Sequence, residues 1–545
     1  MPRHWRSRFL LAGLSVAATL IVLGAAEIAW RASHPVSGWR RVEHESIHHQ
    51  LRLLQACARV ESRSGEPWLV GVDPEFTRSL EVPLNRSAGV ARIAIVGESS
   101  AAMLGYAMDD LLATRKDDEA IELLHCGLAG TSLEQVELRL EEVLRYSPDA
   151  IVFVFGHNIA MSNPMDSGAL RRRRLMIHSR LVTDLADRIF VPGQSPSGSV
   201  PERIKALRRT LERLDQRTRP RGITVVVHTL AGNLRIPPST PVSVRNDSRF
   251  VSALAERHVH GTRAAIDGLR RLVEARDEPY WRYTFGSWLE ELGDLKRAAA
   301  QFRLAKDADV TAPNRATSSV NAALRVAARE AGFLLRDTQR AVAVAAPGGI
   351  AGWESLRDNC HLTGQWFSSE ARATITLLSK AGRLPAATPD RLDGPVESDD
   401  NYIEFVLRGL LSIQERLDDE NAWSWIEAAD SLVAYWLDRD PDGTVVAIDA
   451  FIAGSESFAI APPDRRAHLL VAMGNGAWRA GQHAFARRLN DRARALPVVS
   501  GWIQRAGFLI VQGRVDAARD ALANASQIDP HAALAQAVAR ALDDP

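Results

Sequence analysis

The sequence contains very little cysteine. Its 545 residues include three cysteines, Cys57, Cys126 and Cys360, which lie far apart in the chain. Their number and spacing exclude a disulfide framework and a zinc site built from closely spaced cysteine pairs. One thiol must stay unpaired within a monomer. Whether the other two form a disulfide is left open, because sequence spacing does not give the distance between two Cα atoms.

The chain also lacks an excess of charge of either sign. Its 67 Lys and Arg residues balance 66 Asp and Glu residues, and the formal net charge is +1. A nucleic-acid-binding protein normally carries a strongly basic domain or stripe. We therefore expect no nucleic-acid partner, and the 46% hydrophobic content is that of a globular protein with several domains.

Long hydrophobic runs are missing except near the N-terminus. Residues 9–26 form an uncharged, apolar run, and three arginines precede it. A run of this length can span a membrane, and positive charge before it favours a cytoplasmic N-terminus. The sequence therefore predicts a membrane anchor over residues 1–31, with the body of the chain on the extracytoplasmic, periplasmic side. A cleaved signal peptide is the alternative, since small residues at 24–26 offer a cleavage site.

Five short apolar runs rich in β-branched residues alternate with helical patterns. Most of these runs end near a glycine or an aspartate, as a buried parallel strand ends in a turn. This alternation predicts an α/β fold, with a parallel sheet covered by helices on both faces and a site at the carboxyl ends of its strands. The predicted strands are Ile93–Val96, Ile121–Cys126, Ala150–Phe155, Ile223–Thr229 and Phe333–Leu335.

The C-terminal part of the chain is helical in pattern and shows signs of a repeat. Gly481 and Gly513 are each followed by alanines at helical spacing, and they lie about one tetratricopeptide repeat length apart, roughly 34 residues. A similar pattern over Trp281–Ala308 predicts a helical hairpin inserted into the α/β domain. Stacked repeats commonly bind a protein or peptide on their concave surface. Packing of these helices against the α/β domain, without a partner, is the alternative.

These patterns divide the chain into consecutive parts. The linker among them is recognised by its content of Pro, Asp and Gly. The predicted parts are an anchor (1–31), a stalk or lead-in segment (32–88), an α/β domain (89–382) with a helical insertion at about 240–315, a linker (383–399) and an all-α, tetratricopeptide-like domain (400–545).

The first strand of the predicted parallel sheet is followed by a serine on a turn. The segment Gly97-Glu98-Ser99-Ser100 stands between that strand and a helix-permissive stretch. A serine on a sharp turn at the carboxyl end of a buried strand is held exposed, with its amide directed into the site. Taken alone, the segment fits a helix N-cap equally well.

Asp358 and His361 could supply the groups that activate this serine. Spaced three apart, they face the same side of a helical turn. A serine hydroxyl becomes a good nucleophile when an imidazole takes its proton, and a carboxylate holds that imidazole in orientation. We therefore expect Ser99, His361 and Asp358 to form a catalytic triad. A surface turn is the alternative for an isolated Asp-x-x-His.

Two loops at neighbouring strand ends carry candidate oxyanion donors. Gly130 follows the second predicted strand, and Asn158 follows the third within Gly156-His157-Asn158. A glycine amide and an asparagine side-chain amide are suitable donors to the oxygen of a tetrahedral intermediate. We expect His157 to form a hydrogen bond across the strand ends; contact with substrate is the alternative.

Read together, these segments resemble the SGNH hydrolase family, also called GDSL esterases and lipases. Gly97-Glu98-Ser99 is similar to its first sequence block, with Glu in place of the usual Asp, and Gly130 is similar to the glycine of the second. Gly156-His157-Asn158 and the Asp-x-x-His that ends at His361 are similar to the third and last blocks. The match is closest to membrane-anchored members with tetratricopeptide-like repeats. These relatives usually have an acidic residue where this chain has Ile159.

The resemblance implies a fold and a set of roles. The fold would be a three-layer, parallel-sheet SGNH or flavodoxin-like domain. Ser99 would attack an acyl carbonyl, His361 would transfer the proton and Asp358 would orient His361. The amides of Ser99 and Gly130 and the side chain of Asn158 would form the oxyanion hole. No metal or organic cofactor is implied, since these groups suffice for acyl transfer.

The expected function is that of a serine ester hydrolase acting on an acyl ester, such as an acetyl ester, of an envelope glycan or lipid. An O-acyltransferase that modifies an extracellular polysaccharide is an alternative, because the same groups serve both reactions. A second alternative is a non-catalytic scaffold that binds proteins through its helical repeats. Ile159 and the repeats motivate the scaffold hypothesis, whereas the complete set of Ser99, Asp358, His361, Gly130 and Asn158 argues against it.

Overall fold

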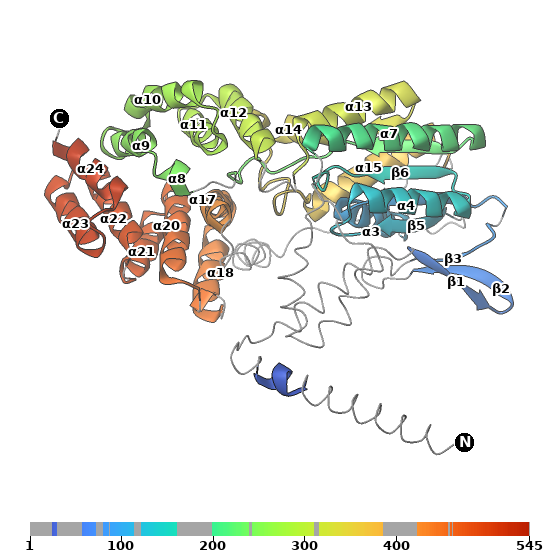
Figure 1. Cartoon of the computed structure of the whole chain (residues 1–545), viewed down its shortest axis with the longest axis horizontal. Coiled ribbons are helices and arrows are strands. Elements are labelled where there is room, and N and C mark those ends of the chain that lie inside the picture. Colours follow the sequence, from blue (N-terminus) through green and yellow to red (C-terminus); the bar gives the residue numbers. More distant parts are fainter. Residues whose placement is uncertain are drawn as a thin grey trace, which may run out of the picture.

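The computed structural model is an α/β protein with one parallel five-stranded sheet and many helices (Figure 1). It describes most of the chain from Cys57 onward. The described residues are 24–29, 57–71, 80–86, 88–113, 121–160, 199–238, 242–309, 315–384, 422–455, 458–459, 461–496 and 498–543.

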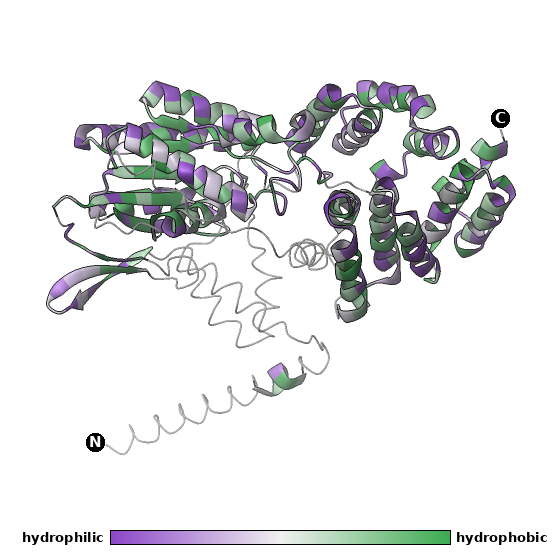
Figure 2. Ribbon diagram, turned by 180° about the vertical axis from the view of Figure 1, so that it is seen from behind, coloured by the Kyte–Doolittle hydropathy of each residue, from purple (hydrophilic) through white to green (hydrophobic). Residues whose placement is uncertain are grey.

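The parallel sheet forms from the five predicted runs. Its strands pair in the order β5-β4-β6-β7-β8, all parallel. Most of their residues are buried, which explains why the sequence shows continuous apolar runs instead of alternation (Figure 2). Because β4 lies between β5 and β6, the turns after those two strands flank the turn after β4. The strands are β4 (Ala91–Gly97), β5 (Ile121–Gly127), β6 (Ala150–Val154), β7 (Thr224–His228) and β8 (Leu334–Arg336).

Helices cover both faces of this sheet. The helices α3 and α15 pack together on one face, and α4, α7 and α13 pack on the other. Capping boxes at Ser132 and Ser199 start α4 and α7, which satisfies backbone amides that have no partner within the helix. The bounds are α3 (Ser99–Ala113), α4 (Leu133–Val143), α7 (Val200–Thr218), α13 (Ser318–Ala331), α14 (Thr338–Ala345) and α15 (Gly364–Lys380), with 3₁₀ turns η1 (Leu144–Tyr146), η2 (Arg219–Arg221) and η3 (Pro347–Gly349).

The segment predicted as a stalk contains a small antiparallel sheet. It consists of β1 (Ala58–Arg63), β2 (Glu66–Gly71) and β3 (Glu81–Pro83). Cys57, just before β1, forms a disulfide with Cys126 of β5, and their Cα atoms lie 5.3 Å apart. The Glu142 carboxylate of α4 accepts a hydrogen bond from the Cys57 amide at 2.9 Å. The small sheet is therefore attached to the α/β domain.

The insertion and the C-terminal part are built from helical hairpins. In the hairpin of α11 and α12, Gly286 lies against the ring of Phe302, as expected for Trp281–Ala308. Gly481 and Gly513 have positive φ and close the turns between α20 and α21 and between α22 and α23. The bounds are α8 (Val242–Arg245), α9 (Ser248–His260), α10 (Thr262–Ala275), α11 (Pro279–Glu291), α12 (Leu295–Ala308), α17 (Ala422–Arg439), α18 (Pro441–Gly454), α20 (Pro463–Arg479), α21 (His483–Arg494), α22 (Val499–Val511), α23 (Val515–Ile528) and α24 (Ala533–Asp543).

The insertion joins the C-terminal helices in one helical body, which the sequence did not predict. Val251 and Ala255 of α9 are buried in a cluster with residues of α22, α23 and α24, among them Leu522 and Val538. Figure 1 shows α9 beside α22 and α24, far from the sheet in the view. The two parts, separate in sequence, therefore share a hydrophobic core.

The prediction of a single-pass membrane protein is corrected by the structure. In the described residues, no helix is both long enough and apolar enough to cross a membrane. Of the predicted anchor, residues 24–29 are described and are helical, and the remainder of 1–31 lies outside the described residues. Of the predicted linker 383–399, only the first two residues are described.

Candidate active site

The turn that carries Ser99 depends on two glycines without room for a side chain. A Cβ on Gly97 would lie 1.8 Å from the carbonyl oxygen of Val154, and a Cβ on Gly127 would lie 2.3 Å from the amide nitrogen of Ala102. These close approaches let α3 begin directly against the ends of β4, β5 and β6. Ser99 is the first residue of α3, so its hydroxyl is held at the carboxyl edge of the sheet.

A chain of hydrogen bonds joins the three predicted triad residues. Ser99 Oγ lies 2.6 Å from His361 Nε2, although the two residues are 262 positions apart. His361 Nδ1 lies 2.6 Å from Asp358 Oδ2. A neutral imidazole that donates from Nδ1 to Asp358 leaves Nε2 free to accept the proton of Ser99, which is the arrangement that general-base activation requires.

The Asp358 carboxylate is held by groups of its own turn. Its Oδ1 accepts hydrogen bonds from the amides of Cys360 at 2.9 Å and His361 at 2.7 Å. Removal from water would raise the pKa of Asp358, but the hydrogen bond and charge of His361, together with these amides, lower it to about 2. Asp358 is thus an anion at neutral pH and can stabilise a positive charge on His361.

A segment after β7 fixes the turn that carries Asp358. The side chain of Asn233 donates to the Asp358 carbonyl oxygen at 3.1 Å, and the Asn233 amide donates to the Asn359 carbonyl oxygen at 2.9 Å. Asn233 is fully buried. Its two hydrogen bonds hold the turn of Asp358 and His361 in place, so the position of His361 depends on the segment that follows β7.

The two predicted oxyanion residues lie on either side of the Ser99 turn. Gly130 is in the turn after β5 and has a φ of 68°, a left-handed conformation that favours glycine. Asn158 is in the turn after β6 and is 7% exposed. Because β4 lies between these strands, both turns are adjacent to the start of α3, which is where donors to an oxyanion on the acyl group of Ser99 are needed.

Glu98 is the main site residue that the sequence analysis missed. Its side chain is fully buried, and its two carboxylate oxygens accept hydrogen bonds from the amides of His157 and Asn158, each at 2.9 Å. The loop therefore has an acidic partner although residue 159 is Ile. Burial raises the pKa of Glu98 to about 7, and the hydrogen bonds from His157, Asn158 and Gly156 and the charge of His361 oppose that rise.

His157 forms a structural hydrogen bond, as expected, although its partner lies in the segment before α13 and not at another strand end. Its Nδ1 accepts a hydrogen bond from the Ala316 amide at 3.0 Å, and the ring is buried. Burial, together with the positive charge that His361 can carry, lowers the pKa of His157 to about 3. The ring is therefore neutral at neutral pH and serves as an acceptor that fixes the loop of Asn158.

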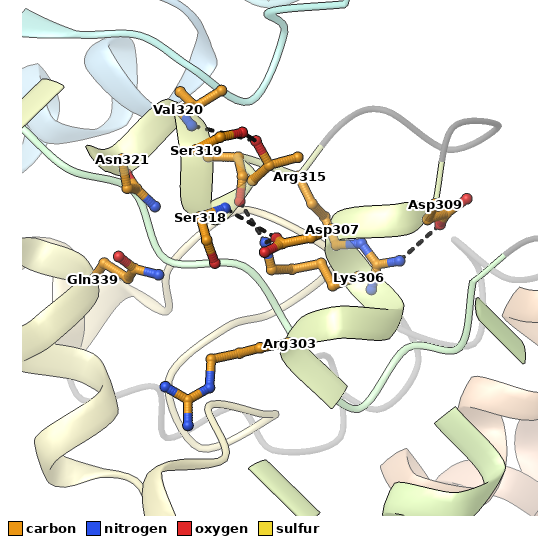
Figure 3. Close-up of polar contacts among 12 residues, drawn as sticks. Arg303, Lys306, Asp307, Asp309, Arg315, Ser318, Ser319, Val320, Asn321 and Gln339 are labelled. Carbon is orange, nitrogen blue, oxygen red and sulfur yellow. Dashed lines mark hydrogen bonds and ion pairs between the residues drawn. The ribbon is translucent and has the colours of Figure 1, made fainter. Parts of the chain in front are cut away.

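A polar cluster at the end of α12 holds the segment that contacts His157 (Figure 3). The ammonium group of Lys306 is buried and donates to Asp307 at 2.6 Å and to the Ala316 carbonyl oxygen at 2.7 Å. Asp307 also accepts from the Ser318 amide at 2.9 Å. The inserted helical hairpin is thus connected to the loop of His157 and Asn158.

Arg315 extends this cluster toward the triad. It forms an ion pair with Asp309 at 2.8 Å, and both side chains are buried. Its guanidinium also donates to the carbonyl oxygens of Asn233 at 3.1 Å and Ile236 at 2.7 Å. Asn233 in turn holds the Asp358 turn, so one end of the insertion supports both sides of the site. Neither Lys306 nor Arg315 has a local sequence pattern that would have revealed this role.

One group of metal-ligating side chains stands out in the described part of the chain. Asp358, Cys360 and His361 offer ligand atoms that lie within 4.8 Å of one another. Both ring nitrogens of His361 already face a hydrogen-bonding partner, Ser99 or Asp358. Burial raises the pKa of the Cys360 thiol well above its usual value, which disfavours the thiolate that a metal needs. The geometry therefore fits a triad better than a metal site.

Comparison with known proteins adds no relative. The chain matches no model of a known protein family. No curated protein matches it either.

Proposed function

We propose that the chain is a serine ester hydrolase of the SGNH type. The observation that carries the proposal is the chain of two 2.6 Å hydrogen bonds from Ser99 through His361 to Asp358. These three residues come from two distant parts of the sequence. Such a geometry is the main requirement for activating a serine.

The arrangement of the sheet supports the same assignment. When the five strands are numbered 1 to 5 along the chain, their order in the sheet, β5-β4-β6-β7-β8, becomes 2-1-3-4-5, which is the order of flavodoxin-like folds. In such folds, ligands bind outside the carboxyl ends of the strands, at the point where the strand order reverses. That point lies between β4 and β6, and Ser99 begins α3 directly after β4.

The mechanism follows from these contacts. His361 Nε2 takes the hydroxyl proton as Ser99 Oγ attacks the acyl carbonyl carbon, and Asp358 stabilises the imidazolium that forms. Amides at Ser99 and Gly130 and the side chain of Asn158 stabilise the oxyanion. The imidazolium gives its proton to the leaving alcohol. Water, deprotonated by the same imidazole, then attacks the acyl-enzyme and releases the carboxylic acid.

Hydrolysis of a small ester tests this proposal. The purified full-length chain should hydrolyse p-nitrophenyl acetate, and Ser99→Ala should lower kcat/KM by at least about 10³-fold, the scale seen when a triad nucleophile is removed. Ser100→Ala is the matched control, since Ser100 is the next residue of α3 and forms no part of the triad. Equal rates for wild type and Ser99→Ala would refute the proposal.

A further inference from the structure

A large cleft lies beside the segment that carries Asp358 and His361. Its volume is about 880 Å³, within the range of about 300 to 1,000 Å³ that is typical of ligand sites. Trp353 and Ser355, shortly before Asp358, form part of one wall, and Trp366, shortly after His361, forms another part. Residues of α11, α17 and α20 line much of the rest, together with Arg235, Arg257 of α9, Ala345 of α14 and Pro347 of η3. The cleft thus lies between the catalytic segment and the helical body.

The walls of the cleft are fixed to one another by hydrogen bonds. The indole nitrogen of Trp353 donates to Ser431 Oγ of α17 at 2.9 Å. The segment after β7 joins them, because the Arg235 carbonyl oxygen accepts from Ser431 Oγ at 3.2 Å and from Tyr283 Oη of α11 at 2.7 Å. These contacts hold the catalytic segment, the insertion and α17 in one arrangement. A ligand in the cleft would therefore have a constant position relative to the triad.

The charges that line the cleft nearly cancel. Arginines and carboxylates line it in similar numbers, and several form pairs, such as Arg257 with Glu291 and Arg479 with Asp430, each at 2.8 Å. Paired charges of both signs give little net attraction for a polyanion or a polycation. The lining therefore favours a ligand without net charge.

The same lining is too polar for a lipid chain. A hydrocarbon tail among these carboxylates and guanidinium groups would remove water from them without replacing its hydrogen bonds, which is unfavourable. Sugar rings offer hydroxyl groups to such side chains, and their C–H faces can pack on aromatic rings. Trp353, Trp366 and Tyr435 line the cleft, and the Arg439 guanidinium lies 4.5 Å from the centre of the Tyr435 ring.

We propose that this cleft binds an uncharged glycan and presents its O-acyl groups to Ser99. The inference rests on the proposed esterase function and names its substrate class. In the reaction, the acyl group passes from the glycan oxygen to Ser99 Oγ, and the glycan hydroxyl receives its proton from His361. Water then releases the carboxylic acid.

Binding to an inactive variant tests the cleft separately from the chemistry. Full-length Ser99→Ala would be titrated calorimetrically with cellotetraose, maltotetraose and chitotetraose. We expect at least one to bind, and we expect the added change Tyr435→Ala to raise its Kd by at least about tenfold. Val446→Ala, an exposed change on the neighbouring helix α18, should change Kd by less than about twofold. Should Tyr435→Ala not fold, Asp438→Ala replaces it, with Asp442→Ala as its control.

Enzyme assays separate failure of the cleft from failure of the proposed function. In the active chain, Tyr435→Ala should lower kcat/KM for an acetylated tetrasaccharide by about tenfold and leave p-nitrophenyl acetate hydrolysis unchanged. Absence of binding to all three oligosaccharides, or equal loss with Val446→Ala, would overturn the cleft assignment. Binding of an anionic polysaccharide or a fatty-acyl micelle in their place would also overturn it. Glycan binding without any ester hydrolysis would refute the esterase and keep the binding site.

Discussion

The buried carboxylate of Glu98 should control the position of the loop that carries His157 and Asn158, and Glu98→Gln tests this. The carboxylate accepts hydrogen bonds from the His157 and Asn158 amides. A glutamine offers one acceptor oxygen, and its NH₂ group would face the second amide, which leaves a buried donor without an acceptor. Such a loss costs about 1 to 3 kcal/mol. If this cost falls on the loop of Asn158, kcat should fall by about 10- to 100-fold with little change in KM.

The pH dependence provides a second readout for Glu98. Its pKa is about 7 in the folded chain, so the carboxylate that holds the loop is lost as the pH falls below 7. In the wild type, log(kcat/KM) for p-nitrophenyl acetate should therefore fall more steeply on the acid side than in Glu98→Gln, which cannot titrate at this position. Glu98→Asp keeps the charge on a shorter side chain and should restore the steeper slope. Wild-type kcat and an unchanged slope in Glu98→Gln would refute the argument.

The raised pKa of Glu98 should also make the folded chain less stable as the pH rises. Between the unfolded pKa of 4.5 and the folded pKa of about 7, the folded chain binds a proton at Glu98 that the unfolded chain has lost, so the stabilising contribution disappears as pH rises. From pH 5 to pH 8 the wild type should lose about 2 to 3 kcal/mol relative to Glu98→Gln. Urea unfolding of both chains at the two pH values measures this difference.

Three further predictions concern the scaffold of the site. Gly97→Ala should lower the free energy of unfolding by at least about 3 kcal/mol, because the new Cβ would clash with backbone atoms. Gly268→Ala should raise the free energy of unfolding by about 0.5 to 1 kcal/mol, because Gly268 lies inside α10 with open space around it. Urea midpoints that rank the two variants in the opposite order would contradict this packing. Reduction of Cys57–Cys126, which spans 69 residues, should lower stability by up to roughly 4 kcal/mol, and an unchanged thermal midpoint after reduction would refute the disulfide. The pKa of His157 is about 3 in the folded chain and 6.5 in the unfolded chain, so its contribution to the free energy of unfolding should be lost as the pH falls below 6.5. The loss should reach about 2 kcal/mol at pH 5. Urea unfolding of His157→Gln should not show this loss.

The parallel sheet was predictable because each strand is local and buried. A run such as Ile93–Val96 must be apolar on both faces to lie between two helical layers, and that requirement is visible in four residues. The turns that end these runs are equally local. Each of the five strands lies where the sequence predicts it, with ends that differ from the predicted ones by at most two residues.

The small sheet and the shared helical core could not be predicted in the same way. β1 and β3 are short and partly exposed, so their alternation is weak, and the sheet is attached to the α/β domain through long-range contacts to Cys126 and Glu142. The contact of α9 with α24 joins residues far apart in sequence. An amphipathic pattern shows that a helix has a buried face and does not identify the helix that covers it.

Some residues of the candidate site could likewise be predicted from local sequence, and others could not. Ser99, Asp358 and His361 were identified because their residue types and local spacing carry chemical meaning, and the structure brings them together. Glu98 was seen only as part of a sequence block, because its partners are backbone amides 59 and 60 residues away. Arg315 acts through carbonyl oxygens of a distant segment, and backbone acceptors leave no mark in a sequence.

The most direct test of the central claim is covalent labelling of the full-length chain with a fluorophosphonate probe, which reacts with activated serines. We predict that the wild type is labelled at Ser99 and that both Ser99→Ala and His361→Ala abolish labelling, since the nucleophile needs its 2.6 Å contact with the imidazole. The absence of labelling in wild-type protein with a cooperative unfolding transition, or labelling that persists in Ser99→Ala, would contradict the account.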